Sequence, residues 1–122
     1  MGLTNRKLVL KIEKGTTFTK KFRWKNKYKE PINLYGFDFK SQFRYDFGDD
    51  KVLCTLTVDN GGIVVNPSEG EIEIIITSDI TSTLNNYDSG MWSIEYRQTT
   101  GENFPFKTLI KGRWVVEPEV TV

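Results

Sequence analysis

The segment PINLYGFDFKSQFR, residues 31–44, is the part of the sequence that decides the fold. From residue 37 onward, even positions carry polar or charged residues, and most odd positions are aromatic: Phe37, Phe39, Phe43, Tyr45 and Phe47. A period of two places alternate side chains on opposite faces of a β-strand. We therefore predict that this segment is the central strand of a β-sandwich.

Other short alternating runs precede and follow this segment, separated by turn residues. They are LVLKI (8–12), FTKKFRWK (18–25), VLCTLTV (52–58), EIEIIIT (71–77), MWSIEYRQ (91–98) and FKTLIKGRWVVEP (106–118). Such a series is typical of an antiparallel sandwich or barrel, here with about seven to nine strands. Only SDITSTLNN (78–86) suggests helix, as one short turn near residues 78–85 capped by Ser78 or Asp79.

Length and composition favour a single domain over residues 1–122, with short arms at Met1–Lys7 and Pro118–Val122. No apolar run is long enough to span a membrane, and Met1–Arg6 lacks the pattern of a signal peptide. We expect a soluble protein that is not secreted through a cleaved leader. One cysteine excludes an internal disulfide, and without histidine the usual zinc ligand sets are absent, so we expect no metal and no cofactor.

The lack of histidine also excludes the Ser-His-Asp and Cys-His forms of nucleophilic catalysis. Cys54 is predicted to share one buried face with Val52, Leu56 and Val58, which predicts a buried, inert thiol. Glu71 and Glu73 are two residues apart on one strand, where a solvated polar face explains them better than a catalytic pair. We expect that the protein is not an enzyme.

Charge is distributed unevenly along the chain. Residues 1–45 contain 12 Lys and Arg against 3 Asp and Glu, and residues 46–122 contain 5 against 13, which gives +9 and −8. This asymmetry indicates either a basic face that binds an anion or two complementary faces that join copies into a ring. Pairing of strands from the two halves within one sheet would instead cancel the field.

The segment KKFRWKNKYK (20–29) interleaves six basic residues with aromatic ones. We interpret it as a protein interface or as a solvated strand edge guarded by lysines, with nucleic acid binding as the least favoured alternative. Trp24, Trp92 and Trp114 are in phase with apolar neighbours and are predicted to be core residues. The candidate interface residues are Lys20, Arg23, Lys25, Lys27, Tyr28, Lys29, Tyr35 and Tyr87.

Four segments together carry a resemblance to a known family. They are KGTTFTKKFRWK (14–25), PINLYGFDFKSQFR (31–44), TSDITSTL (77–84) and GRWVVEPEVT (112–121). In this order they resemble small phage virion proteins with an immunoglobulin-like β-sandwich, including the N-terminal domain of baseplate upper proteins from lactococcal phages. In the second segment Pro31, Gly36 and Arg44 stand at the positions that mark the family's strand.

The resemblance implies an immunoglobulin-like sandwich and a structural role in the virion, assembled in the host cytoplasm. It implies other phage structural proteins of the tail, baseplate, neck or fibre as partners, and no catalytic residues. This sequence has no shaft or receptor-binding region, which favours a connector or fibre-adaptor module. A capsid decoration protein, or a carbohydrate-binding accessory module with Tyr28, Tyr35 and Tyr87 as its platform, is the alternative.

Overall fold

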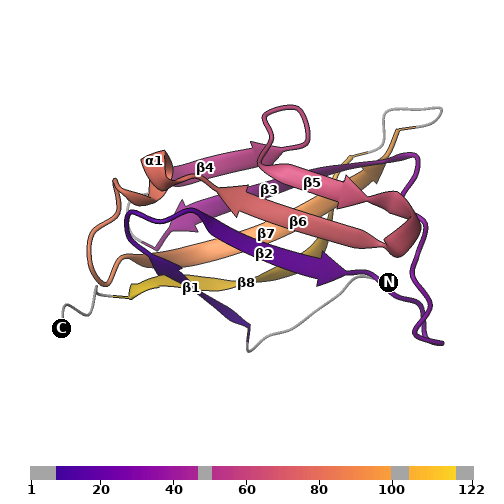
Figure 1. The fold of residues 1–122 in the computed structure, drawn as a ribbon, viewed down its shortest axis with the longest axis horizontal. Coiled ribbons are helices and arrows are strands. Elements are labelled where there is room, and N and C mark those ends of the chain that lie inside the picture. The colour runs from indigo at the N-terminus through magenta and orange to yellow at the C-terminus, as the bar shows by residue number, and fades with distance from the viewer. Residues whose placement is uncertain (1–7, 47–50, 100–104, 118–122) are drawn as a thin grey trace.

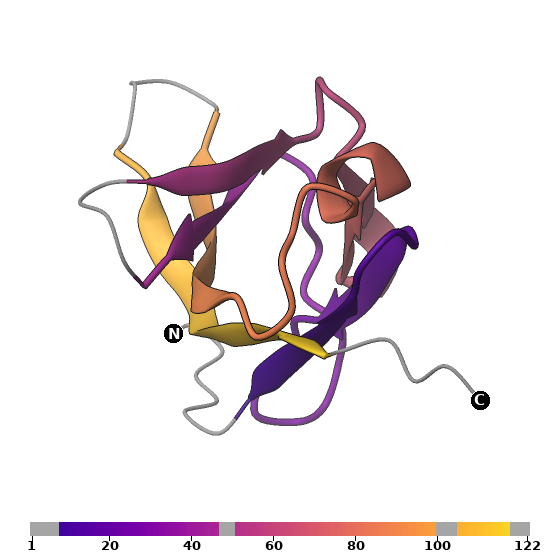
Figure 2. The ribbon, with the colours of Figure 1, turned by 90° about the vertical axis from the view of Figure 1, so that its left-hand side faces the viewer.

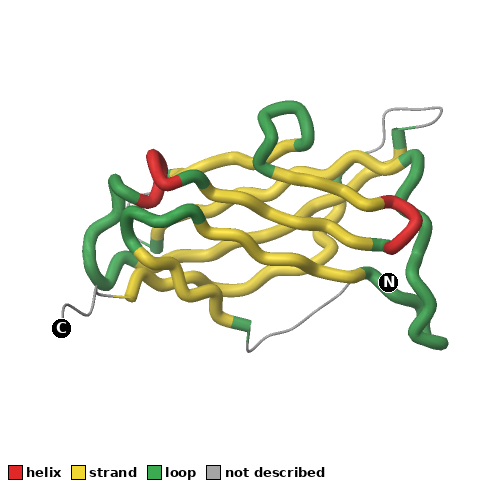
Figure 3. Tube along the Cα trace, in the orientation of Figure 1, coloured by secondary structure: helices red, strands yellow, loops and turns green. Residues whose placement is uncertain are grey.

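The structure is a computed structural model that describes residues 8–46, 51–99 and 105–117, and these ranges contain eight strands. The first four are β1 (Val9–Glu13), β2 (Phe18–Arg23), β3 (Phe37–Tyr45) and β4 (Val52–Thr57). The others are β5 (Ile63–Asn66), β6 (Glu71–Ile76), β7 (Ser89–Gln98) and β8 (Lys107–Glu117). Two short helical segments, η1 (Pro67–Glu69) and α1 (Ser78–Thr81), lie at opposite ends of the strands (Figure 3).

The strands form two sheets that face each other (Figures 1 and 2). The five-stranded sheet has the order β1-β8-β7-β3-β4, and the three-stranded sheet has the order β2-β6-β5. All neighbours are antiparallel except β1 and β8, which run parallel. The arrangement of β3, β7 and β8 opposite β2, β5 and β6 is that of an immunoglobulin domain. The predicted all-β, immunoglobulin-like sandwich is confirmed.

Strand β3 shows why the alternating aromatic pattern was informative. Phe39 and Phe43 are buried between the sheets, and Phe37 and Tyr45 are partly buried against the same core. Ser41 shares their face and is also buried, where its hydroxyl donates to the Ser93 carbonyl at 2.7 Å. The strand pairs with β7 on one side and β4 on the other, but β7 is the middle of the five strands, so the prediction of a central position is off by one strand. Phe47 lies outside the described residues.

The core between the sheets consists of branched aliphatic side chains around large rings. All three tryptophans belong to it, as predicted. Gly112 lies where β8 passes the indole of Trp92, and a Cβ atom there would come within 2.9 Å of Trp92 Nε1. The glycine therefore leaves room for a neighbouring ring.

Two local expectations are wrong for physical reasons. Val52 and Val58 do not share the buried face of Leu56, because the register shifts between Phe43 and Arg44 and turns Val52 outward, and because Val58 lies past the end of β4. The helix at the predicted place begins after Thr77, so neither Ser78 nor Asp79 is its cap. Extended backbone at Thr77 leads directly from β6 into the helical turn.

Candidate functional site

A small hairpin projects from the end of β2 and is the most exposed structured part of the predicted interface (Figure 1, lower right). Its arms are joined by a bridge between Lys25 and Pro31. Asn26 organises the turn, because its side-chain oxygen accepts the backbone N–H groups of Tyr28 at 2.8 Å and Glu30 at 3.1 Å. Lys29 takes up a left-handed conformation with φ of 64° and donates its N–H to the Asn26 carbonyl at 3.0 Å. We call residues 25–36 the hairpin end.

The hairpin end continues through a loop that packs on η1. The N–H of Leu34 donates to the Pro67 carbonyl at 3.0 Å, and the Asn33 side chain accepts the Tyr35 N–H at 2.9 Å. Tyr28 and Tyr35 are 71% and 70% exposed, although the backbone around both is held by hydrogen bonds. Exposed aromatic side chains on an ordered backbone are a common feature of protein interfaces.

The basic side chains of the candidate interface divide into two groups. Arg23 contacts Glu71 on the neighbouring strand β6, with 3.3 Å between Nη2 and Oε2, and Lys21 reaches the same carboxylate at 3.8 Å. Lys25 and Lys29 form no ion pair within the described part of the chain, and the Lys27 ammonium lies 5.1 Å from the centre of the Tyr28 ring. Arg23 is therefore engaged within the sheet, whereas the lysines of the hairpin keep their charge available for a partner.

Two predicted interface residues lie elsewhere. Lys20 is exposed in the middle of β2, in phase with the partly buried Phe18 and the buried Phe22, at the free edge of the three-stranded sheet. Tyr87 is exposed just before the start of β7, whereas Tyr35 lies beside the strand's other end, where Thr99 donates to Gly36. Ten residues of β7 separate the two, about 33 Å at strand rise. The three tyrosines proposed as one platform therefore lie on opposite ends of the sandwich.

The chemistry of the remaining candidates is limited. Burial raises the pKa of the Cys54 thiol to about 12, so the reactive thiolate is scarce at neutral pH. Within residues 8–46, 51–99 and 105–117, no three acidic or cysteine side chains are grouped to hold a metal ion. No helix of these ranges is long and apolar enough to cross a membrane.

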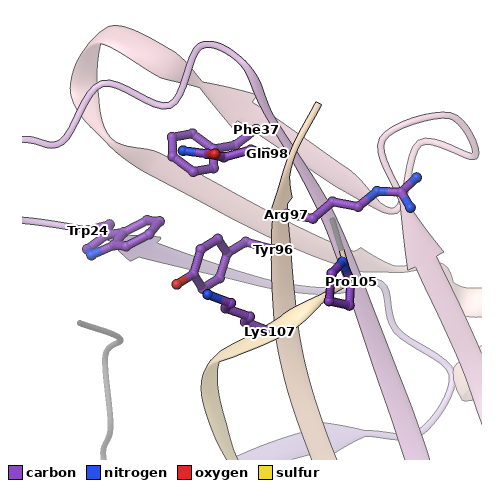
Figure 4. A pocket seen from close by; sticks show the side chains of 7 residues that line it. All are labelled: Trp24, Phe37, Tyr96, Arg97, Gln98, Pro105 and Lys107. Carbon is purple, nitrogen blue, oxygen red and sulfur yellow. The ribbon is translucent and has the colours of Figure 1, made fainter. Parts of the chain in front are cut away.

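One feature was not identified from the sequence, a cavity of about 320 Å³ next to the base of the hairpin (Figure 4). The rings of Trp24, Phe37 and Tyr96 form its apolar wall, and Gln98 and Lys107 supply polar groups. The sequence pattern correctly assigned Trp24 to the core but gave no sign that one side of its ring borders solvent. No period in the sequence could bring residue 24 next to residues 96 and 107.

No family model and no curated protein matches this chain. Among solved structures, it is similar to the N-terminal domain of phage TP901-1 ORF48, with 10% sequence identity and a TM-score of 0.48. The alignment covers 90% of this chain and 85% of that chain. This likeness is one of backbone arrangement and concerns no site residue.

Proposed function

We propose that this protein is a structural component of a bacteriophage particle that acts through contacts with other particle proteins. The finer form of the proposal is a connector or fibre adaptor in the tail, baseplate or neck. The four sequence segments that resemble phage virion proteins support the class of protein. The exposed tyrosines and lysines of the hairpin end support the proposal that it acts through contacts with other proteins.

The observation that carries the proposal is a hydrogen-bonded hairpin with surface lysines, of which Lys25 and Lys29 form no ion pair with any residue that the structure describes. Asn26 fixes the turn through two side-chain hydrogen bonds, so little conformational freedom remains to be lost on docking. Tyr28 supplies exposed aromatic area, and the lysines supply charge. A partner of matching chemistry presents carboxylates around an apolar patch, because complementary charge speeds association and fixes orientation.

A ring of identical copies receives less support than the charges along the sequence suggested. Four ion pairs join a basic residue of residues 1–45 to an acidic residue of residues 46–122: Lys11–Glu117, Lys21–Glu71, Arg23–Glu71 and Lys40–Glu95. Pairing of strands from the two halves thus cancels part of the asymmetry within one molecule. The ring remains a prediction, and sedimentation velocity of the purified protein tests it.

The main experiment reverses the charge of two lysines on the hairpin and leaves the rest of the sequence unchanged. Lys25→Glu combined with Lys29→Glu is supplied in trans to a phage that lacks the gene, and protein in purified particles is quantified by mass spectrometry. We expect the variant to be absent from particles while folding normally, because exposed substitutions usually change stability by no more than about 0.5 kcal/mol.

The matched control is Lys14→Glu combined with Lys111→Glu, which makes the same change in net charge at two other exposed lysines. We expect this control to enter particles at the wild-type ratio. Equal incorporation of both double variants would show that the hairpin is not the docking surface.

The copy number of the wild-type protein tests the class of protein itself. A low, symmetric multiple relative to the major capsid protein agrees with a tail, baseplate or neck position. An abundance equal to that of the capsid protein identifies a decoration protein instead. Absence from particles overturns the proposal.

A further inference from the structure

The cavity beside the hairpin lies between Trp24, which follows β2, and the adjoining ends of β3, β7 and β8 (Figure 4). Its three aromatic rings are inclined to one another rather than parallel, and the Trp24 and Tyr96 rings meet edge to face. The Trp24 and Tyr96 rings are 5.1 Å apart at 64°, and Phe37 lies 6.0 Å from each of them. The rings therefore form an apolar corner that can receive a compact group, but they do not form the parallel slot that would hold a flat base.

The indole N–H of Trp24 distinguishes it from the other two tryptophans. Trp92 Nε1 donates to the Arg113 carbonyl at 3.0 Å, and Trp114 Nε1 donates to the Arg44 carbonyl at 3.0 Å. Trp24 Nε1 has no hydrogen-bond partner among the described residues, which also contain no buried side-chain nitrogen or oxygen without a partner. The Trp24 N–H is therefore accessible to solvent or to a ligand.

A β-bulge brings an ammonium group to the same place. Ile94 pairs with Ile110, but Glu95 pairs with Thr108 and Tyr96 with Lys107, so Leu109 is an extra residue in β8. Without this bulge Lys107 would point to the outer face. With it, Lys107 pairs with Tyr96 across the strands and shares its face, and both side chains line the cavity (Figure 4). Bulges commonly redirect a side chain in this way next to functional sites.

Lys107 forms no ion pair within the described ranges, whereas the other cation at the rim is already engaged. Arg97 lies 3.4 Å from the Asp38 carboxylate, and its guanidinium stacks 4.4 Å from the centre of the Phe106 ring. Among the described residues, no acidic side chain lines the cavity. Lys107 is thus the cation that is free to meet a negatively charged ligand.

We propose that this cavity binds a saccharide unit that carries a carboxylate. The ring corner packs against the C–H face of the sugar, Lys107 meets the carboxylate, and the Gln98 amide bonds hydroxyl groups, while the indole nitrogen of Trp24 lies on the side of its ring away from Tyr96 and Lys107 (Figure 4). A purely apolar peptide side chain would bury these polar groups without partners, which is unfavourable. The volume of about 320 Å³ is at the lower end for ligand sites and suits one sugar unit rather than a chain.

The test uses D-glucuronate as the probe and the three indole N–H signals of the intact chain in ¹H–¹⁵N correlation spectra. We expect the Trp24 signal to shift and saturate, while the Trp92 and Trp114 signals, whose donors are occupied, stay in place. D-glucose and sodium acetate are titrated over the same range, and we expect each to shift the Trp24 signal at least fivefold less at equal concentration.

Lys107→Gln should weaken glucuronate binding at least fivefold, whereas Lys111→Gln on the outer face of the same strand should leave it unchanged. An unchanged Trp24 signal with all probes overturns the site. Equal shifts with glucose overturn the role of the carboxylate, and equal shifts with acetate overturn the role of the sugar. These results do not depend on the hairpin lysines, so the proposal can fail while the particle-assembly proposal stands.

Discussion

The two ends of the sandwich differ in how their polar groups are used. At the end that carries α1, the Thr81 hydroxyl donates to the Thr16 carbonyl at 2.6 Å, and Trp114 Nε1 donates to the Arg44 carbonyl. The backbone there is also tied, since Val116 donates to the Asp88 carbonyl at 2.8 Å. The opposite end of the sandwich consists of the hairpin end and the cavity beside it, and there Trp24 Nε1, Lys25, Lys29 and Lys107 have no such partners among the described residues.

This difference indicates that the α1 end serves the stability of the fold and that the hairpin end serves the recognition of a partner. Buried polar groups must be paired for a core to be stable, and the α1 end meets that requirement internally. The hairpin end keeps an ordered backbone but leaves donors and cations open, which is the condition for binding something else. Substitutions at the α1 end should therefore lower stability, and those at the hairpin end should change binding.

The largest effect is expected from Gly90→Ala at the α1 end. An added Cβ would overlap the Arg44 carbonyl and come within 2.8 Å of Trp114 Nε1, and neither strand backbone can move away without breaking the sheet. We expect a loss of at least about 4 kcal/mol, or failure to fold. Urea unfolding followed by circular dichroism measures it.

Gly15→Ala is the control for this substitution, because Gly15 has a φ of 84° but open space around its Cβ position. It should cost about 1–2 kcal/mol from backbone strain alone. A similar loss in both variants would mean that the close packing at Gly90 is not decisive.

Trp92→Phe and Trp24→Phe compare a paired and an unpaired indole. Trp92 is enclosed by Phe22 and Phe43, and its replacement by Phe removes both side-chain volume and the hydrogen bond to the Arg113 carbonyl. We expect this substitution to lower the free energy of unfolding by about 2–3 kcal/mol. Trp24→Phe removes an N–H without a partner and should cost about 1 kcal/mol. Urea midpoints at unchanged m-value report the difference, and equal losses would contradict the distinction.

The sequence predicted which strand faces are buried between the sheets, but it did not predict the arrangement of residues at the two ends of the sandwich. Alternation in β3, β6 and β7 predicted the inner faces correctly, because one buried face fixes strand phase. It failed at Val52, and it could not show that Lys107 turns inward, since a bulge adds one residue and reverses the phase beyond it. The hairpin lysines were found as a basic run, whereas the cavity depends on contacts between distant segments that periodicity does not encode.

Glu71→Gln tests whether the charges of Lys21 and Arg23 stabilise the fold through their ion pairs with Glu71. Glu71 holds Arg23 and Lys21 on the neighbouring strand, and these are partly exposed pairs, so the loss should be about 0.5–1 kcal/mol and should shrink in high salt. Glu73→Gln is the control, because Glu73 forms no ion pair within the described residues. A loss that is the same in both variants, or that salt does not reduce, would contradict the role of Glu71.

The smallest effect is expected at Asp46, which closes the α1 end by accepting hydrogen bonds from Arg113 and from the Ser89 hydroxyl at 2.7 Å. These bonds, that of Arg113 first, hold the pKa of Asp46 below its ordinary value. The contribution to stability is therefore complete above the pKa of the unfolded chain, near 3.9, and is lost as pH falls through the lower folded value. Because the site is exposed, Asp46→Asn should cost only about 0.2–1 kcal/mol at pH 7.

The pH dependence of the unfolding free energy distinguishes the ion pair of Asp46 with Arg113 from a packing effect of the Asp46 side chain. Wild type and Asp46→Asn should converge in unfolding free energy as the pH falls through the folded pKa of Asp46, since the protonated carboxyl no longer attracts Arg113. Asp59→Asn, in the exposed turn after β4, should match wild type across the whole range. A difference between wild type and Asp46→Asn that persists unchanged at low pH would show that Asp46 acts through the shape of the α1 end and not through its charge.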